Sequence, residues 1–280
     1  MTEVRLKISV IIPVGDEAAW DSCRQSLEAS LCFLDPKCGV DFEILPCFDL
    51  KHKGAFNARN EGLAKAKGDW IAWVDCDDVV ERDWAKEIAD AAIAHFDDDI
   101  IQFDTFENWN RNVRLVAYKY KGAVDGDSFA HELLRNDGMP AWLWTRVFKR
   151  NLFEGFRFDG RVKHDYGMFL KMLPRVKSVW SIGKPLYCYM RNGRGLSAYA
   201  QQMDYAVAGA GFENSIAELP SAWRHDANVG LALTMADVAR HSRCENGSRQ
   251  FVRKYLRDVI LDMKVPLRLK AKTMLAAMGL

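Results

Sequence analysis

The feature that most constrains this sequence is the stretch Trp70–Asp78, in which a short apolar run ends in three carboxylates, Asp75, Asp77 and Asp78. An apolar run of this length, preceded by the turn signal Gly68-Asp69, predicts a buried strand. Carboxylates crowded at the end of such a strand repel one another, and burying them unpaired is costly. A divalent cation that carries a ligand's phosphates would balance them. A solvated loop in which Asp77-Asp78 caps the next helix would need no cation.

On both sides of this stretch, predicted strands alternate with predicted helices. Apolar and β-branched runs predict strands at 6–13, 42–47, 70–74 and 99–105, and helical spacing predicts helices at 18–31, 55–67 and 81–96. Alternation of this kind is typical of an α/β fold with parallel strands.

Three of these strands end in acidic residues. Asp16-Glu17 follows the first strand, Asp49 follows the second, and the Asp75 cluster follows the third. Ligands of parallel α/β sheets bind beyond the carboxyl ends of the strands. A lone acidic turn is ordinary, whereas acid at three successive strand ends predicts one polar cleft. This pattern weakens the interpretation of Asp77-Asp78 as a simple helix cap.

The second half of the chain follows a different pattern. It predicts a β-ribbon at 112–120, helices at 127–135 and 164–173, short strands at 176–182 and 185–190, and helices from residue 198 onward with breaks near Pro220 and Gly247. We expect a first domain at 1–200 and a helical C-terminal extension at 201–280. The aromatic, basic segment 141–153 favours the lining of a ligand pocket, or core packing, over nucleic-acid binding.

Composition argues against several classes of protein. A net charge of +1 gives no global field for nucleic acid, so we expect no nucleic-acid partner. Seven cysteines without a Cys-x-x-Cys pair fit reduced thiols better than a disulfide framework or a cysteine zinc site. The apolar run 8–14 is too short for a signal peptide, and nowhere do about 18 apolar residues run without a charge. We expect a cytoplasmic protein that is soluble or membrane-peripheral.

The segment 249–280 is basic and amphipathic. Phe251, Tyr255, Val259 and Met263 share one face of a predicted helix, while basic residues fall elsewhere. Such a segment can lie on an anionic membrane, which would place the protein at the inner face of the cell membrane. It can also pack on the protein with a solvated basic face, which is the commoner case for amphipathic helices.

Five motifs, taken in order, resemble one protein family. They are SVIIPVGDE (9–17), GAFNARNEGLAKAKGDWIAWVDCDD (54–78), WTRVFKRNLF (144–153), HDYGMF (164–169) and PLYCYM (185–190). In order and spacing, over residues 6–200, they are similar to the family 2 glycosyltransferases of bacterial surface-polysaccharide synthesis. The resemblance implies a GT-A fold, which is a Rossmann-like, mostly parallel central sheet with helices on both faces. It also implies a nucleotide-sugar donor such as a UDP-sugar, a Mn²⁺ or Mg²⁺ ion, a glycan or lipid-linked acceptor, and inversion at the anomeric carbon.

The resemblance assigns roles to individual residues. Asp75-Cys76-Asp77 stands at the family's D-x-D motif, so Asp75 would contact the ribose or the metal and Asp77 would coordinate the metal through the diphosphate. Arg59 and the loop from Pro13 to Glu17 match nucleotide-contacting positions. Asp165 matches the acidic residue that serves as general base. A plainer alternative makes Asp165 a helix N-terminal residue favoured by the helix dipole.

The sequence departs from the family pattern in three places. The Asp-Asp-Gly-Ser run that usually follows the second strand is absent, and Asp49 is the candidate to replace its nucleotide contact. Gly15-Asp16 replaces the usual Tyr-Asn before Glu17, and His164 stands where Glu is usual. These departures leave open a second hypothesis, a catalytically degenerate protein that binds nucleotide sugars or acts as a scaffold. A nucleotidyltransferase is a third, but there is no glycine-rich, basic phosphate loop near the first strand.

Overall fold

The computed structural model describes residues 5–49, 54–135, 140–158, 165–191, 205–241 and 247–279, and all structural statements below refer to these residues. The chain forms two compact units. The first comprises Met1–Gly126, Trp142–Gly160 and Arg175–Asn192, and the second comprises Asp127–Ala141, Arg161–Pro174 and Gly193–Leu280. Two internal segments therefore belong with the C-terminal helices. The domain boundary expected at residue 200 stays a prediction.

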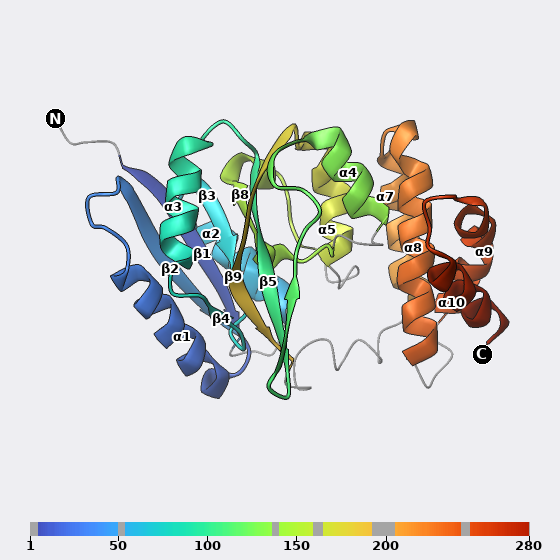
Figure 1. Ribbon diagram of the computed structural model, residues 1–280, viewed down its shortest axis with the longest axis horizontal. Coiled ribbons are helices and arrows are strands. Elements are labelled where there is room, and N and C mark those ends of the chain that lie inside the picture. The colour runs from blue at the N-terminus through green and yellow to red at the C-terminus, as the bar shows by residue number, and fades with distance from the viewer. Residues whose placement is uncertain are drawn as a thin grey trace. The chain divides into compact units, whose positions relative to one another are not determined.

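The first unit is built on a mixed β-sheet (Figure 1). Its strands are β1 (Leu6–Val14), β2 (Val40–Phe48), β3 (Trp70–Trp73), β4 (Val79–Val80), β5 (Ile100–Trp109), β6 (Asn112–Val116), β7 (Gly122–Asp125), β8 (Arg146–Lys149) and β9 (Ser178–Met190). They lie in the order β2-β1-β3-β8-β5-β9-β4, with β6 paired to β5 and β7 paired to β9. The α/β fold class is thus confirmed.

The sheet contains both parallel and antiparallel strand pairs. β1 pairs in parallel with both β2 and β3, and β5 pairs in parallel with β9. β8 runs antiparallel between β3 and β5, and β4, β6 and β7 are also antiparallel to their partners. The sheet is therefore more mixed than the mostly parallel sheet that the sequence predicted, because β8 separates the fourth predicted strand from the first three.

Helices cover both faces of the parallel part of the sheet. They are α1 (Glu17–Cys32), α2 (Ala55–Lys65) and α3 (Trp84–Ala94), with short 3₁₀ turns at Leu143–Thr145 and Arg150–Phe153. Ile8, Val10 and Ile12 of β1 share a buried core with residues of α1 and α3. Ile11 points to the opposite face, since side chains alternate along a strand. There it meets α2 so closely that a Cβ at Gly62 would lie 2.2 Å from Ile11 Cγ2.

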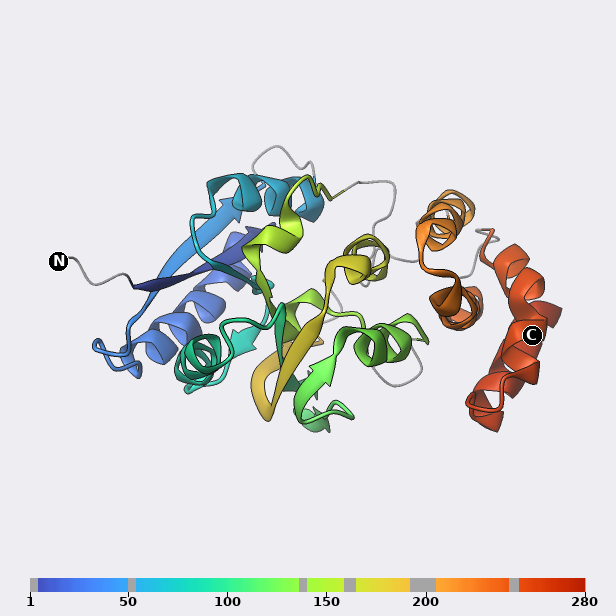
Figure 2. The ribbon, with the colours of Figure 1, turned by 90° about the horizontal axis from the view of Figure 1, so that it is seen from above.

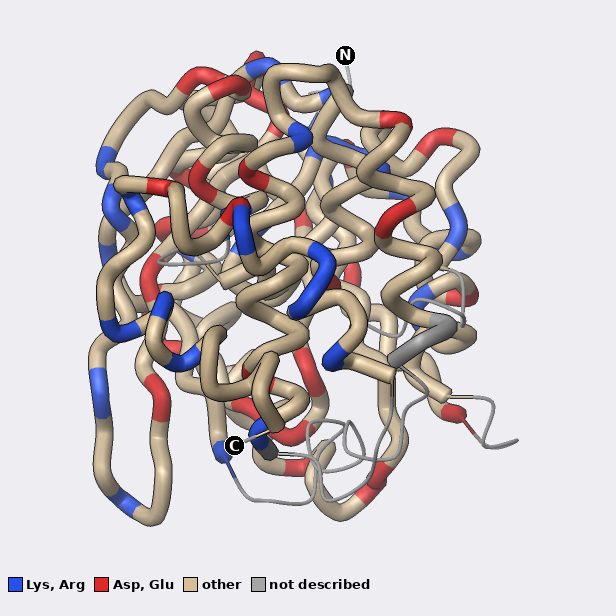
Figure 3. The backbone as a smooth tube through the Cα atoms, turned by 90° about the vertical axis from the view of Figure 1, so that its right-hand side faces the viewer, with Lys and Arg blue, Asp and Glu red and all other residues tan. Residues whose placement is uncertain are grey.

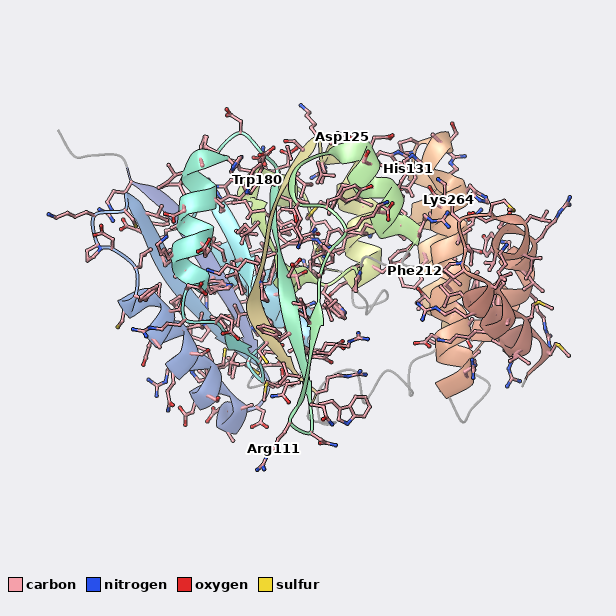
Figure 4. All side chains as sticks on the ribbon, in the orientation of Figure 1. Arg111, Asp125, His131, Trp180, Phe212 and Lys264 are labelled. Carbon is pink, nitrogen blue, oxygen red and sulfur yellow. The ribbon has the colours of Figure 1, made fainter. Side chains whose placement is uncertain are left out.

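Two predicted β-segments take a different form in the structure. The ribbon expected at 112–120 is the hairpin β5–β6, whose tip holds Asn110 and Arg111 at φ values of 49° and 70° (Figure 4). The two strands expected at 176–182 and 185–190 form the single strand β9. The predicted gap between them corresponds to Gly183, at φ +73°, and to shifts in the register of β9 against β5.

The second unit is helical. Its helices are α4 (Gly126–Arg135), α5 (Asp165–Met172), α7 (Tyr205–Glu218), α8 (Ser221–His241), α9 (Ser248–Leu261) and α10 (Leu267–Met278), with a 3₁₀ turn at Leu173–Arg175. The predicted breaks near Pro220 and Gly247 are confirmed, and a further break precedes Pro266. Figure 2 shows these helices from above, with α9 and α10 in red. Among the described helices, none is both long enough and apolar enough to cross a membrane.

A buried ion network ties this unit together. The guanidinium Nη1 of Arg135, on α4, donates to Asp226 Oδ1 at 2.8 Å and to Asp262 Oδ2 at 2.7 Å. His131 (labelled in Figure 4) contacts Asp226, and His225 Nε2 lies 3.2 Å from Asp262 Oδ2. The network therefore joins α4 to α8 and to the turn between α9 and α10.

Replacing Asp262 tests this network. Burial alone would raise the pKa of Asp262, but the hydrogen bonds from Arg135, the Lys264 backbone N–H and His225, together with the charge of Arg135, outweigh burial, and the pKa falls to about 2. An acid whose pKa is lower in the folded state stabilises the fold above its unfolded pKa and loses that contribution as the pH falls. We expect Asp262→Asn to lower the free energy of unfolding by about 1–2 kcal/mol at neutral pH. Urea unfolding should show the difference from wild type shrinking between about pH 4 and pH 2.

The matched control is Asp237→Asn. The Asp237 carboxylate is 57% exposed and pairs with Lys272, so its replacement should change stability little at any pH. A wild-type advantage over Asp262→Asn that persisted undiminished to pH 2 would contradict the role given to the Asp262 charge.

Candidate active site

The carboxyl ends of β1, β2 and β3 lie together at one edge of the sheet. The register pairs Val14 with Phe48 at the ends of β1 and β2. The Val74 backbone N–H donates to the Ile11 carbonyl at 3.2 Å, and the Asp49 N–H donates to the Val14 carbonyl at 2.9 Å. The acidic groups that follow these three strands therefore start from neighbouring positions at the same edge.

Exposure alternates along Asp75–Asp78. The side chain of Asp75 is 30% exposed and Asp77 is partly exposed, whereas Cys76 and Asp78 are buried. Asp75 and Asp77 are therefore accessible to a ligand from solvent, and Asp78 is not. These two accessible carboxylates are the first and third positions of the D-x-D motif.

Arg59 is the positive group beside Asp75. Its Nη2 donates to Asp75 Oδ1 at 3.3 Å, and the residue is only 4% exposed. The guanidinium carbon lies 5.6, 5.9 and 5.7 Å from the ring centres of Phe56, Trp73 and Phe158. Aromatic faces attract a guanidinium and restrict its orientation. Helix α2 therefore holds a fixed positive charge next to the D-x-D motif.

Asn60 supports this arrangement, although no role for it was predicted from the sequence. Its side-chain Oδ1 accepts from the Phe158 backbone N–H at 2.9 Å, and its Nδ2 donates to the Phe158 carbonyl at 3.0 Å. Phe158 in turn packs edge-on against Trp73, with 5.3 Å between ring centres. The NARNEG motif thus supplies both the arginine and the residue that fixes one ring beside it, and the adjacency of Asn60 to Arg59 was the available signal.

Asp78 links the D-x-D segment to β9. It is completely buried and accepts hydrogen bonds from the Tyr187 hydroxyl at 2.8 Å and from the Met190 backbone N–H at 2.7 Å. The same hydroxyl accepts from the Asp75 backbone N–H at 3.0 Å. Burial, reinforced by the charge of Asp75, raises the pKa of Asp78 well above its usual range. One tyrosine hydroxyl therefore fixes both ends of the Asp75–Asp78 segment.

The alternative in which Asp77-Asp78 caps the next helix is wrong. Helix α3 begins at Trp84 with Asp83 as its N-cap residue, and β4 lies between Asp78 and that helix. The buried hydrogen bonds to Tyr187 and Met190 use the carboxylate instead. Because these partners lie more than 100 residues away in the chain, local sequence pattern could not identify them.

The remaining nucleotide-contact candidates surround the ends of β1 and β2. Pro13 is buried in β1, and Glu17 is exposed as the first residue of α1. Asp16 caps that helix by accepting from the Ala18 N–H at 2.9 Å. Asp49 is partly exposed, and its Oδ2 accepts from the Gly54 N–H at 2.5 Å. The Asp49 carboxylate thus binds the N-cap residue of α2 while it stands at the strand edge.

Asp165 belongs to the second compact unit, unlike the other six predicted site residues. It is the first residue of α5 and is partly exposed. Its neighbour His164 lies outside the described residues. A carboxylate in the first turn of a helix is favoured by the helix dipole whatever else it does. The assignment of Asp165 as general base therefore stays a prediction.

An aromatic stack adjoins the Tyr187 hydroxyl. Trp144 is buried and stacks on Tyr187, with ring centres 4.6 Å apart, and on Trp142 at 4.7 Å. Trp142 and Tyr189 are partly exposed. Both alternatives for segment 141–153 therefore keep support, since Trp144 packs in the core while Trp142 remains accessible to a ligand.

The D-x-D carboxylates offer a divalent cation part of a coordination shell. Asp75 and Asp77 supply the hard oxygen ligands that Mg²⁺ and Mn²⁺ prefer, and the phosphates of a ligand complete shells of this kind. Among the described residues, three adjacent metal-ligating groups come together at a different place, at His225, Asp226 and Asp262. Arg135 already forms ion pairs with both carboxylates of that set. The D-x-D pair therefore fits a cation that arrives together with a diphosphate.

Comparison with known protein sequences bears on the same residues. The family model described as Glycosyl transferase family 2 matches residues 46–168, which contain Arg59, the D-x-D motif and Asp165. A curated relative, Glycosyltransferase GlyA of Streptococcus pneumoniae serotype 4 (strain ATCC BAA-334 / TIGR4), is 23% identical over 221 residues. The alignment covers 75% of this chain but 30% of the relative, so this chain matches less than a third of that protein's length.

Solved structures share the fold at low sequence identity. S. aureus TarS 1–349 in complex with UDP has a TM-score of 0.63 at 17% identity, over 98% of this chain and 88% of that chain. The complex of the same TarS fragment with UDP-GlcNAc gives 0.62 at 16% identity, with the same coverage. The mannosyltransferase PcManGT from Pyrobaculum calidifontis, in complex with GDP-Man and Mn²⁺, gives 0.50 at 14% identity, over 98% and 86% of the two chains. The predicted GT-A fold is confirmed.

Replacing Tyr187 tests the link between the D-x-D segment and β9. Tyr187→Phe keeps the ring stacked on Trp144 but leaves Asp78 with the Met190 N–H alone and leaves the Asp75 N–H without this acceptor. We expect the free energy of unfolding to fall by about 1–3 kcal/mol, the cost of leaving buried polar groups unsatisfied. Denaturant unfolding measures this loss. Tyr189→Phe, in a partly exposed ring that stacks on the same Trp144, should cost less, and equal losses in the two variants would contradict the role of the Tyr187 hydroxyl.

Proposed function

We propose that this chain, which belongs to glycosyl transferase family 2, moves a sugar from a nucleotide-diphosphate donor to a glycan or lipid-linked acceptor with inversion at the anomeric carbon. The main observation that supports this proposal is the pair of accessible carboxylates, Asp75 and Asp77, at the shared edge of β1, β2 and β3, with Arg59 fixed beside them. A UDP-sugar is the first candidate donor, and the sugar moved is a hexose or an N-acetylhexosamine. The complexes of TarS with UDP-GlcNAc and of PcManGT with GDP-Man support a donor of this class.

Donor binding is assigned to the first compact unit. Asp75 and Asp77 hold Mn²⁺ or Mg²⁺ with the diphosphate, and Asp75 also meets the ribose. Such a cation stabilises negative charge on the leaving diphosphate as a Lewis acid. Arg59 orients Asp75 and compensates its charge. The residues that contact the nucleotide are Pro13, Glu17 and Asp49.

Transfer is assigned to Asp165. The bond between the anomeric carbon and the diphosphate oxygen breaks while the acceptor hydroxyl oxygen bonds to the same carbon from the opposite side. The hydroxyl must lose its proton in this step, and a carboxylate within hydrogen-bond reach can accept it. A place in surface-polysaccharide synthesis, at the cytoplasmic face of the membrane, would supply acceptors of the proposed class.

A non-catalytic nucleotide-sugar-binding or scaffolding protein is the second candidate. Two observations favour it: the missing Asp-Asp-Gly-Ser run, and the engagement of Asp49 with the Gly54 N–H at the position where a nucleotide contact is expected. Both candidates would bind nucleotides. Formation of a glycosylated product therefore distinguishes them.

A donor screen tests the proposal. The full chain is incubated with a panel of UDP- and GDP-sugars, with and without Mn²⁺, and hydrolysis and transfer are measured. We expect metal-dependent turnover of one donor, which Asp77→Ala lowers by about a hundredfold or more, the scale seen when transition-state charge loses its stabilising partner. Asp21→Ala, an exposed carboxylate on α1, is the matched control and should leave turnover unchanged. No turnover across the panel would favour the binding protein, and normal turnover by Asp77→Ala would overturn the metal assignment.

Replacing Asp165 separates a general base from a helix N-terminal residue. Asp165→Asn should leave donor affinity, measured by calorimetry, within about twofold of wild type and should lower transfer by about 10²–10⁴-fold. Asp127→Asn is the matched control, because Asp127 also lies in the first turn of a helix in the same unit and its side chain is 68% exposed. If both variants lost only a few tenths of a kcal/mol in stability and kept transfer, the helix-dipole alternative would hold. Loss of donor binding by Asp165→Asn would reassign the residue to the donor site.

A further inference from the structure

Helix α10 exposes an apolar stripe to solvent. Leu267, Met274, Leu275 and Met278 are 83%, 47%, 41% and 68% exposed. With Ala271, which is also exposed, they fall within one side of the helix at 100° per residue. The opposite side is buried at Thr273, Ala276 and Ala277. The stripe is therefore a second apolar face, separate from the one by which α10 packs on its unit.

The end of α9 and the turn before α10 also expose large apolar side chains. Leu261 is 64% exposed and Met263 is 92% exposed, among the most exposed large apolar side chains of the described residues. Lys264, labelled in Figure 4, and Leu267 follow directly. We call Leu261, Met263, Leu267, Met274, Leu275 and Met278 the apolar stripe.

Basic residues border the stripe on both sides. On a helix of 3.6 residues per turn, Arg268 and Lys270 lie about 80° to either side of its centre. Helix α10 contains no acidic residue. Residues 247–279 as a whole have eight Lys and Arg against two Asp, a net charge of +6, although the whole chain carries only +1. Figure 3, in which the C-terminal helices face the viewer, draws the Lys and Arg positions in blue.

The two acidic residues of this segment do not offset the basic border. The Asp262 carboxylate is 6% exposed and binds Arg135, and Asp258 Oδ1 faces the ring of His225 at 4.0 Å. Lys272 and Lys254 are paired with Asp237 and Glu213, but both lie outside the border formed by Arg268 and Lys270. The surface around the stripe is therefore positive where the stripe would meet a partner.

We propose that the apolar stripe, with Arg268 and Lys270, docks the protein on an anionic membrane surface. The apolar side chains enter the boundary between headgroups and acyl chains, and the basic residues meet the lipid phosphates. Charge favours this occupant over a second copy of the chain, because two copies would bring like charges together along the same stripe. The supply of a lipid-linked acceptor at this surface rests on the proposed function, whereas the docking itself does not.

Vesicle binding by the full chain tests the proposal. We expect co-sedimentation with vesicles of phosphatidylcholine mixed with phosphatidylglycerol, at least about tenfold weaker binding to phosphatidylcholine alone, and weaker binding at high salt. Two variants divide the contributions: Leu267→Gln/Met274→Gln/Met278→Gln removes apolar area, and Arg268→Gln/Lys270→Gln removes charge. Each variant should weaken vesicle binding by about tenfold or more. Neither should unfold the protein, because the substituted side chains lie outside the face by which α10 packs on its unit.

The control is Val113→Gln/Leu115→Gln on β6. These side chains are 59% and 51% exposed, so the control removes exposed apolar area from a different element and should bind vesicles as wild type does. Asp77→Ala should also bind normally, which separates a failure of docking from a failure of the proposed function. The proposal is overturned if wild type does not bind anionic vesicles or if both stripe variants bind as wild type does. It is also overturned if light scattering shows stripe-dependent self-association in place of vesicle binding.

Discussion

The parallel pairing of β1 with both β2 and β3 is the constraint on which the donor side of the candidate site depends. Parallel neighbours end at the same edge, so residues that follow three separate strands start from adjacent positions without any contact between their side chains. Register matters as much as direction, because a slip of one residue would turn each side chain to the opposite face. Ile11 against Gly62 on one face and the shared core with α1 and α3 on the other fix β1 against such a slip.

The three carboxylates of the segment Asp75–Asp78 have three different environments. Asp75 lies against the fixed guanidinium of Arg59, and Asp78 is buried with hydrogen bonds from Tyr187 and Met190 and a raised pKa. Asp77 stays at the surface beside them. Fixing the first and last residues of the segment removes the conformational freedom that a cation would otherwise have to restrict. A segment held in this way is prepared for a charged ligand before the ligand arrives.

The sequence predicted the parts of this arrangement that depend on local pattern. Strands and helices of the first hundred residues follow apolar periodicity, and the cluster of carboxylates at Asp75–Asp78 can be read directly from the sequence. The roles given to the D-x-D motif and to Arg59 came from the family resemblance. The sequence did not predict β8, because residues 146–149 lie within an aromatic, basic segment that has no clear period of two. Nor did it predict the use of Asp78, whose partners Tyr187 and Met190 join it only through tertiary pairing of β4 with β9. Hydrogen bonds between residues far apart in the chain leave no local sequence pattern, so these contacts could not be predicted.

For helices α9 and α10 the sequence pattern could not tell which apolar side chains are buried and which are exposed. Both are amphipathic and basic, and the sequence suggested one membrane-facing or packed surface running through Phe251, Tyr255, Val259 and Met263. In the structure Phe251 is buried against Gly209 of α7 and Val259 is buried against residues of α8, so α9 follows the packed alternative. Helix α10 packs through Leu269 and the small residues Thr273, Ala276 and Ala277, whereas its other large apolar residues, Leu267, Met274, Leu275 and Met278, stay exposed. Exposed Leu and Met side chains in a contiguous stripe mark a surface that interacts with something other than the protein's own core. Because basic residues border that exposed apolar face, an anionic membrane surface is the counterpart that matches both its apolar side chains and its charge.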